Sequence, residues 1–194
     1  MSEIKVPKTQ HPVHELITKR WSARAFSERQ ITIDELNTLF EAASWTASSV
    51  NEQPWKYLYA FKGTQAFEKM IEVMSAGNQP WAKNASVILI SLSKRSFDHN
   101  GMPNRHHMHD VGAANTTLLL QAAHQDIYGH IIGGFHMEQA IEAFNIETDI
   151  WEIACFITIG YLDEPNTLDE PYRTREQTAR TRKSVNEFTQ KLES

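Results

Sequence analysis

The chain has 194 residues, of which 41% are hydrophobic and 22% charged, and its formal net charge is −5. This length suits one substantial domain, which can bury a core without disulfides or a structural metal. The composition excludes global disorder. The 19 basic and 24 acidic residues give no basic excess that would favour nucleic acid or an anionic membrane as a partner. We therefore expect a single domain over residues 1–194.

The sequence carries no signal for export or for membrane insertion. The single cysteine, Cys155, cannot form an internal disulfide, so nothing favours an oxidising compartment. The N-terminal residues lead into polar sequence without the apolar run of a signal peptide. No uncharged apolar stretch approaches the ~20 residues of a membrane span. These features predict a cytoplasmic protein.

Hydrophobic spacing and turn residues predict helices and strands that alternate along the chain. A first helix over residues 12–20 opens at a proline, and a second begins at Thr32, whose spacing to Glu35 is that of a capping box. The polar residues over 48–54 favour neither helix nor strand, whereas residues 55–61 are typical of an aromatic-rich strand. The remaining elements are expected in this order: a helix after residue 64, a strand over 87–90, a long helix over 109–125, a turn or short strand over 128–135, a short helix over 137–144 and a strand over 151–161.

The long helix and the C-terminal end differ most in character. The helix is nearly free of charge after Asp110, which predicts a central, buried position. The last ~30 residues are polar and basic, with too few apolar residues for a core of their own. We expect a core over about residues 12–162 and an extension over about residues 163–194. Interleaved helices and strands indicate an α/β or α+β fold.

Two polar clusters precede the first predicted strand. In residues 20–26, Arg20, Ser22 and Arg24 supply donors that suit a phosphate, although a solvated basic turn would look the same. Residues 48–55 display hydroxyl and amide groups that can line a flat heteroaromatic ring, and a plain surface loop would also do so. Neither cluster identifies a ligand by itself.

Two further clusters lie in the second half of the chain. Gly133 and Gly134 follow an apolar segment and allow the backbone to approach a ligand closely, although most such pairs are turns. The C-terminal extension is rich in basic residues, which either form a solvated face or return to an anionic ligand. These basic residues are Arg173, Arg175, Arg180, Arg182 and Lys183.

The histidines near the start of the long helix raise the question of a metal site. His106, His107, His109 and Asp110 are possible ligands, and His106 and Asp110 would share a helix face. A second ligand cluster at a recognisable spacing is missing, so hydrogen-bonded or solvated imidazoles are expected and no metal site is predicted. Cys155, in an apolar strand, is expected to be an inert core thiol. No GxSxG, P-loop or GxGxxG motif occurs.

Taken in order, these clusters resemble the nitroreductase family. The resemblance spans roughly residues 12 to 188, and its most specific part is the loop that ends Asn51-Glu52-Gln53-Pro54-Trp55. The matching segments are Arg20-Trp21-Ser22-Ala23-Arg24-Ala25-Phe26, Ser48 to Trp55, Asp110 to Ala114, Ile132 to Phe135, Ile159 to Tyr161, and Arg180 to Arg182.

The resemblance implies an α+β fold of the nitroreductase type, a three-layer α/β/α sandwich around a central mixed, mainly antiparallel sheet. It implies an intertwined homodimer with two FMN molecules at the interface. NAD(P)H would be the electron donor, and a nitroaromatic, a quinone or a related conjugated compound the acceptor, in a ping-pong cycle. Because the flavin N5 carries the chemistry, no residue is given a catalytic role.

The resemblance also implies a set of cofactor-binding residues. Arg20, Ser22, Arg180 and Arg182 would hold the FMN phosphate and ribityl chain, and Arg24 would lie near the pyrimidine edge. The polar loop would reach the flavin bound mainly by the other subunit, and the paired glycines would place backbone amides near N5. The full set is Arg20, Trp21, Ser22, Arg24, Ser48, Ser49, Asn51, Gln53, Ile132, Gly133, Gly134, Arg180 and Arg182.

Other functions remain open at this point. A flavin-binding redox module without turnover would carry the same motifs, as would a specialised member of the family such as a reductive dehalogenase. A metal-dependent enzyme built on residues 106–110 is the remaining alternative. The chain departs from the family at Ala47, where many relatives have proline, and at Asp126 and His136, which are commonly glycine and aspartate. These departures bear on loop geometry and substrate preference.

Overall fold

A computed structural model describes residues 3–193, which fold around one β-sheet. Within this part of the chain the sheet has four strands in the order β1-β2-β4-β3, and every neighbouring pair is antiparallel. An isolated parallel bridge between Ser22 and Gly129 adds an extended segment beside β3. The sheet is therefore mixed but mainly antiparallel. The strands are β1 (Trp55–Phe61), β2 (Val87–Lys94), β3 (Ile127–Ile132) and β4 (Trp151–Tyr161).

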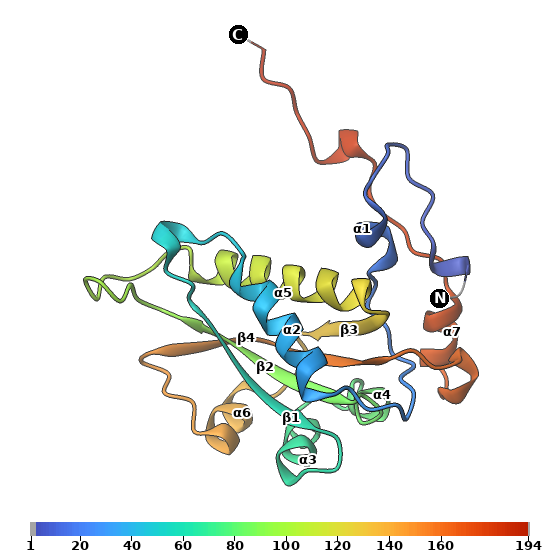
Figure 1. Cartoon of the computed structure of the whole chain (residues 1–194), viewed down its shortest axis with the longest axis horizontal. Coiled ribbons are helices and arrows are strands. Elements are labelled where there is room, and N and C mark those ends of the chain that lie inside the picture. Colours follow the sequence, from blue (N-terminus) through green and yellow to red (C-terminus); the bar gives the residue numbers. More distant parts are fainter. Residues whose placement is uncertain (1–2, 194) are drawn as a thin grey trace.

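Helices cover both faces of the sheet, which confirms the three-layer arrangement (Figure 1). Successive side chains of a strand point to opposite faces. Accordingly, Val87 and Leu89 of β2 pack into the core on one face, and Ile88 and Ile90 pack into the core on the other. The first face carries α2 (Ile33–Ser44) and α5 (His107–His124), and the second carries α3 (Gln65–Glu72), α4 (Gln79–Ala82) and α6 (Met137–Phe144).

The long helix α5 crosses the sheet and is central, as the sequence predicted (Figure 1). Its side toward the sheet includes Leu118 and Leu119, both buried. A Cβ atom at Gly129 of β3 would lie 2.4 Å from Leu119 Cδ2, so only glycine lets the strand approach the helix this closely. At 1.5 Å per residue, the 18 residues of α5 span about 27 Å.

Most predicted boundaries are confirmed, and the exceptions are short elements. The capping box of Thr32 and Glu35 is present at the start of α2. The first helix, α1 (Glu15–Lys19), is shorter than the predicted range 12–20, because the His14 side chain accepts a hydrogen bond from the Leu16 amide and caps the helix there. The segment over 128–135 contains the strand β3. The sequence did not predict α4 or α7 (Tyr172–Gln177).

The N-terminal end of the described chain lies beside α7 (Figure 1). The buried Lys5 ammonium donates hydrogen bonds to the carbonyls of Arg175, at 3.0 Å, and Thr178, at 2.7 Å. Beyond this contact, residues 181–193 are exposed and extend away from the sheet. The C-terminal extension thus has an anchored part, up to about Arg180, and an extended part.

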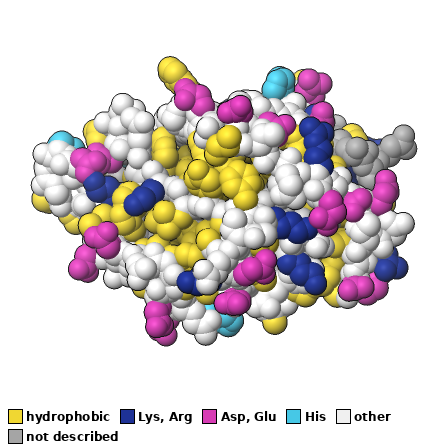
Figure 2. Space-filling model, turned by 60° about the horizontal axis from the view of Figure 1, so that its bottom comes forward, with side chains coloured by type: hydrophobic (Ala, Val, Ile, Leu, Met, Phe, Trp, Pro, Cys, Tyr) yellow, Lys and Arg dark blue, Asp and Glu magenta, His cyan; other side chains and the backbone are white. Residues whose placement is uncertain are grey.

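The surface on the α3 and α6 side is hollowed, and hydrophobic side chains gather in the hollow (Figure 2). Half-buried hydrophobic residues that pack on the core of this layer include Ile71, Ile141 and Phe144. Over residues 3–193, no helix combines the length and the apolar character needed to cross a membrane.

Candidate functional site

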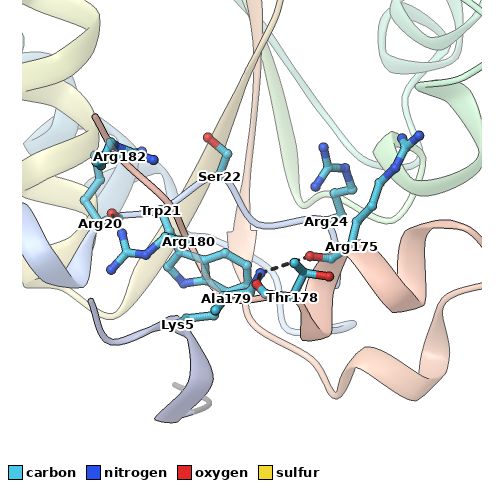
Figure 3. Close-up of a pocket in the computed structure, with 10 residues that line it drawn as sticks. All are labelled: Lys5, Arg20, Trp21, Ser22, Arg24, Arg175, Thr178, Ala179, Arg180 and Arg182. Carbon is cyan, nitrogen blue, oxygen red and sulfur yellow. Dashed lines mark hydrogen bonds between the residues drawn. The ribbon is translucent and has the colours of Figure 1, made fainter. Parts of the chain in front are cut away.

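A cavity of about 330 Å³ lies where the segment after α1 meets the C-terminal extension. Arg20, Arg180 and Arg182 stand on one side of it, and Arg24 and Arg175 on the other (Figure 3). The described residues that line it include no aspartate or glutamate. The lining consists of Lys5, Arg20, Trp21, Ser22, Arg24, Arg175, Thr178, Ala179, Arg180 and Arg182.

Local backbone geometry explains why alternate residues of the segment line the cavity. Arg20 ends α1 in an extended conformation, and Ser22 then pairs with Gly129 at the sheet edge. In extended backbone, residues two apart share a face. Arg20, Ser22 and Arg24 are therefore partly or fully exposed toward the cavity, whereas Ala23 is buried in the core and Trp21, which also lines the cavity, is only 5% exposed.

Hydrogen bonds from three elements fix this segment. His130 of β3 lies with its Nδ1 3.1 Å from the Ala23 carbonyl. The Glu176 carboxylate of α7 accepts hydrogen bonds from the backbone amides of Arg24, at 3.1 Å, and Ala25, at 3.4 Å. Arg180 donates to the carbonyl of Arg20 at 2.7 Å. These hydrogen bonds hold the segment in place before a ligand binds. This favours tight binding, because little conformational entropy is lost when the ligand enters.

The clustered arginines repel one another. Burial lowers the pKa of Arg20, and the nearby Arg182 charge lowers it further. The pKa of Arg180 is lowered by burial first and then by Arg20 and Arg182. Arg180 Nε is buried without a hydrogen-bond partner in the described chain. A cluster of this kind is stabilised by an anion with several acceptor oxygens, which a phosphate provides.

One acid, Glu176, lies behind the segment and acts on the charges of Arg24 and Lys5. Glu176 is 2% exposed, and burial raises the pKa of its carboxyl group. The pKa of Glu176 is lowered, in opposition to burial, by the hydrogen bonds from the amides of Arg24 and Ala25 and by the charges of Lys5 and Arg24. Because Glu176 contacts backbone amides and does not form an ion pair with a lining guanidinium, the cavity itself keeps its positive charge.

The polar loop over residues 48–53 lies at the far end of α5. Its Ser49 amide donates to Asp110 Oδ2 at 2.9 Å, close to the start of the helix. The cavity lies near the other end, where Lys19 forms an ion pair of 2.6 Å with Asp126. Within one chain, the length of α5 therefore separates Ser48, Ser49, Asn51 and Gln53 from the arginine cavity.

The paired glycines follow β3, which runs along the segment that carries Arg24. Gly129 to Gly133 covers about 13 Å of extended chain. A Cβ atom at Gly133 would meet no described atom within 4 Å, so its backbone faces open space. The Gly134 carbonyl accepts hydrogen bonds from the Ser75 amide and from Asn78 Nδ2, both at 3.0 Å. Ile132, at the end of β3, is 2% exposed.

The histidines and the cysteine make ordinary contacts. His106 is the N-cap residue of α5, and its carbonyl accepts a hydrogen bond of 3.0 Å from the Asp110 amide, so the two residues lie one helical turn apart. The Asp110 carboxylate accepts its hydrogen bond from the Ser49 amide. His107 Nδ1 lies 2.8 Å from Ser93 Oγ. In the described part of the chain, no three His, Cys, Asp or Glu side chains come together at metal-binding distance. Burial raises the pKa of the Cys155 thiol to about 12, which keeps it protonated.

Several residues around the cavity carried no signal in the sequence. Lys5 and Glu176 reach it from opposite ends of the chain, and their sequence neighbours form no motif. Trp81 of α4 packs against both Arg24 and His130. Their contribution depends on contacts that only the folded chain creates.

The fold and this cavity define an α+β protein with a cationic pocket at a sheet edge. The chain belongs to the nitroreductase family, whose sequence model matches residues 17–161. A solved structure described as an oxidoreductase containing FMN superposes with a TM-score of 0.90. It is 31% identical in sequence, and the match covers 97% of this chain and 96% of that one.

Two curated relatives are more distant. A protein from Archaeoglobus fulgidus named as an NADH dehydrogenase/NAD(P)H nitroreductase is 26% identical over 152 residues, which are 75% of this chain and 83% of that protein. An oxygen-insensitive NADPH nitroreductase from Helicobacter pylori is 24% identical over 149 residues, 76% of this chain and 65% of that protein.

Proposed function

We propose that the chain is an FMN-dependent oxidoreductase that transfers hydride from NAD(P)H to a nitroaromatic, a quinone or a related conjugated acceptor. The observation that carries this proposal is the arginine cavity beside β3. The chain has this cavity in a fold that it shares, at 31% identity, with an FMN-containing oxidoreductase.

The chemistry of the donor set fits FMN. Its phosphate carries up to two negative charges and three oxygens that accept hydrogen bonds. Arg20, Ser22, Arg180 and Arg182 supply charged and neutral donors on the walls of one cavity. The buried, unpartnered Nε of Arg180 and the mutual repulsion of Arg20, Arg180 and Arg182 are both relieved by such an anion.

From this phosphate site, the segment and β3 lead toward the paired glycines. Arg24 would lie at the pyrimidine edge of the ring, where a cation favours the reduced form. The Gly133 and Gly134 backbone would lie near N5, and Trp21 and Ile132 would contribute through their backbone. FMN, when bound, supplies an isoalloxazine ring that accepts and donates hydride at N5, and the protein supplies placement and charge.

The site is completed by a second copy of the chain. Ser48, Ser49, Asn51 and Gln53 lie one α5 length from the cavity in their own subunit, so we assign them to the flavin of the partner in a homodimer. Trp45 precedes this loop and is 82% exposed, and Val50 within the loop is 71% exposed. Large apolar side chains that are exposed this far are typical of surfaces covered by a partner.

The C-terminal extension belongs to the same assembly. We propose that residues 163–194 serve the single domain in two ways. The anchored part brings Arg180 to the phosphate, through its hydrogen bonds to the carbonyls of Arg20 and Thr18. The extended part, which exposes Phe188 and Leu192, packs on the partner subunit.

The open face at Gly133 suits alternate occupancy by the donor and the acceptor. We therefore propose ping-pong kinetics, in which NAD(P)⁺ leaves before the acceptor enters. The open face also supports the proposed acceptor class, because a flat conjugated molecule would stack in the place that the nicotinamide ring had left.

The test uses the purified full-length chain under nitrogen. A titration that follows the quenching of FMN fluorescence gives the stoichiometry and the affinity. NADH or NADPH is then expected to bleach the visible spectrum of the bound flavin, and a quinone or nitroaromatic is expected to restore it. Sedimentation equilibrium is expected to give a dimer with two FMN.

Each negative outcome has its own meaning. A chain that does not bind FMN would contradict the proposal as a whole. Bound FMN that both nicotinamides leave oxidised would show a redox module without turnover. Selective turnover of halogenated aromatics would show reductive dehalogenation.

A further inference from the structure

Arg24 is the top of a stack formed by three side chains from three elements. Its guanidinium carbon lies 5.6 Å from the centre of the Trp81 ring, which belongs to α4. The ring of His130, on β3, lies 4.6 Å from the Trp81 ring, centre to centre, with an interplanar angle of 39°. Trp81 is 1% exposed. A cation over a buried indole is attracted by the negative face of the ring, and burial strengthens the contact.

Hydrogen bonds also fix the orientation of Trp81 and His130. Trp81 Nε1 donates to the Gly77 carbonyl at 3.3 Å, which sets the plane of the indole. Burial, and after it the Arg24 charge, lowers the pKa of His130 to about 4. His130 is therefore neutral near pH 7, and its Nδ1–H donates to the Ala23 carbonyl at 3.1 Å. One histidine thus supports the indole and holds the backbone immediately before Arg24.

The element that carries Trp81 also reaches the glycine pair. Asn78, at the start of α4, donates to the Gly134 carbonyl at 3.0 Å. A Cβ atom at Gly134 would lie 2.7 Å from Asn78 Nδ2, so the two segments are in tight contact. The helix α4 therefore joins the Arg24 end of the site to its Gly134 end.

We propose that Trp81 and His130 are positioning residues that fix the Arg24 guanidinium toward the bound flavin and so set the relative affinity for reduced and oxidised FMN. This inference rests on the proposed function. A charge held at one place in a partly buried site stabilises a developing negative charge more than a mobile, solvated charge does. The stack supplies this restraint through groups that themselves carry no charge.

The experiment measures the midpoint potential of bound FMN relative to free FMN, which gives the ratio of affinities for the two redox forms. We expect Arg24→Met to lower the ratio of the affinity for reduced FMN to the affinity for oxidised FMN by about tenfold. This corresponds to a midpoint potential that is lower by about 30 mV for a two-electron couple. Trp81→Leu is expected to lower the ratio by about threefold, the size of one cation–π contact. Trp81→Phe, which keeps an aromatic ring under Arg24, is expected to leave the ratio close to its wild-type value.

The chain offers a matched control. Lys56 lies over the Trp151 ring at 5.1 Å, a second cation–π pair that takes no part in the cavity. Trp151→Leu is expected to leave the potential unchanged. Thermal unfolding with and without FMN checks that each variant is folded, and His130→Phe tests the stack from its other end if Trp81→Leu does not fold.

The decisive comparison is the double variant Arg24→Met with Trp81→Leu. If Trp81 acts through Arg24, its replacement has no further effect on the potential once Arg24 is gone. Additive shifts, or a potential that Trp81→Leu and His130→Phe both leave unchanged, overturn the inference. A wild-type chain that binds no FMN overturns the proposed function instead, so the two failures are distinguishable.

Discussion

The carboxylate of Asp110 accepts a hydrogen bond of 2.9 Å from the backbone amide of Ser49 and so joins the start of α5 to the loop over residues 48–53. Three residues of this loop have left-handed backbone, and one of them is Val50, with a φ of 47°. A β-branched residue rarely adopts this conformation. The buried acceptor on α5 therefore helps to hold the loop in a shape that its sequence disfavours.

We expect Asp110→Ala to destabilise the chain by about 1–3 kcal/mol, because the Ser49 amide is left without its acceptor. Urea unfolding at one fixed protein concentration measures the change. Asp149, which is exposed, provides the control Asp149→Ala. Equal unfolding free energies for the two variants would show that the Asp110 contact contributes nothing.

We expect Arg20→Ala to weaken FMN binding, since the phosphate loses a charge-assisted partner worth about 1.5–3 kcal/mol. This corresponds to about a 10- to 150-fold rise in Kd. A fluorescence titration at low and high salt measures it, and the loss is expected to shrink as salt screens the charge. Arg105→Ala, outside the cavity, serves as the control. Unchanged affinity would remove Arg20 from the phosphate site.

We expect Glu176→Gln to bind FMN severalfold more tightly at pH 8. Both backbone amides bond to one oxygen, Oε1, which the amide oxygen of glutamine can replace. The other oxygen, Oε2, is buried without a hydrogen-bond partner among residues 3–193. The substitution thus keeps the hydrogen bonds and removes a negative charge beside the cations, so a weaker FMN complex would contradict this account.

The same substitution tests the pH dependence of stability. Because burial raises the pKa of Glu176 in the folded chain, the folded state holds this proton to higher pH than the unfolded state does. Stability is therefore lost as the pH rises from the ordinary value of 4.5 through the raised pKa. The unfolding free energy of the wild type minus that of Glu176→Gln, measured by urea unfolding at several pH values, is expected to fall over this range. Glu164→Gln, on the surface, is expected to behave as the wild type does.

Elements with strong local signals could be predicted from the sequence. The strands over 55–61 and 151–161 and the helix over 137–144 have the predicted bounds, because alternating or helical apolar residues meet turn residues at both ends. The helix α4 has four residues, too few to show a period, so it was missed. The proline at position 12 predicts too early a start for α1, because the His14 side chain caps the helix two residues later.

The site was predictable only in part, for a physical reason. The alternation of Arg20, Ser22 and Arg24 is visible in the sequence, and the extended backbone turns these three side chains to one face. Glu176 and Trp81 are 152 and 57 residues from Arg24, and only tertiary packing brings them to it. His130 is one of nine histidines. His130 matters because burial keeps its side chain neutral, and burial is a property of the folded chain that the sequence alone does not reveal.

That neutral state predicts an acid-sensitive fold. Arg24 and Arg20 are the charged groups that act on His130, Trp81 packs against its ring, and the carbonyl of Ala23 accepts its hydrogen bond. The pKa of His130 is lowered from the ordinary 6.5 to about 4 in the folded chain. Between pH 6.5 and pH 4, this histidine is therefore protonated in the unfolded chain and neutral in the folded chain. The contribution of His130 to stability is therefore complete above pH 6.5 and is lost as the pH falls toward 4, by up to about 3 kcal/mol.

The variant His130→Phe isolates this contribution. It gives up the hydrogen bond to the Ala23 carbonyl and so starts from a lower stability, but it has no group to protonate at this position. Between pH 6.5 and pH 4, its unfolding free energy is expected to fall less steeply than that of the wild type, as measured by urea unfolding. The exposed His124, replaced in the same way, is expected to leave the wild-type slope unchanged. Parallel slopes for the wild type and His130→Phe would show that protonation of this histidine does not oppose folding.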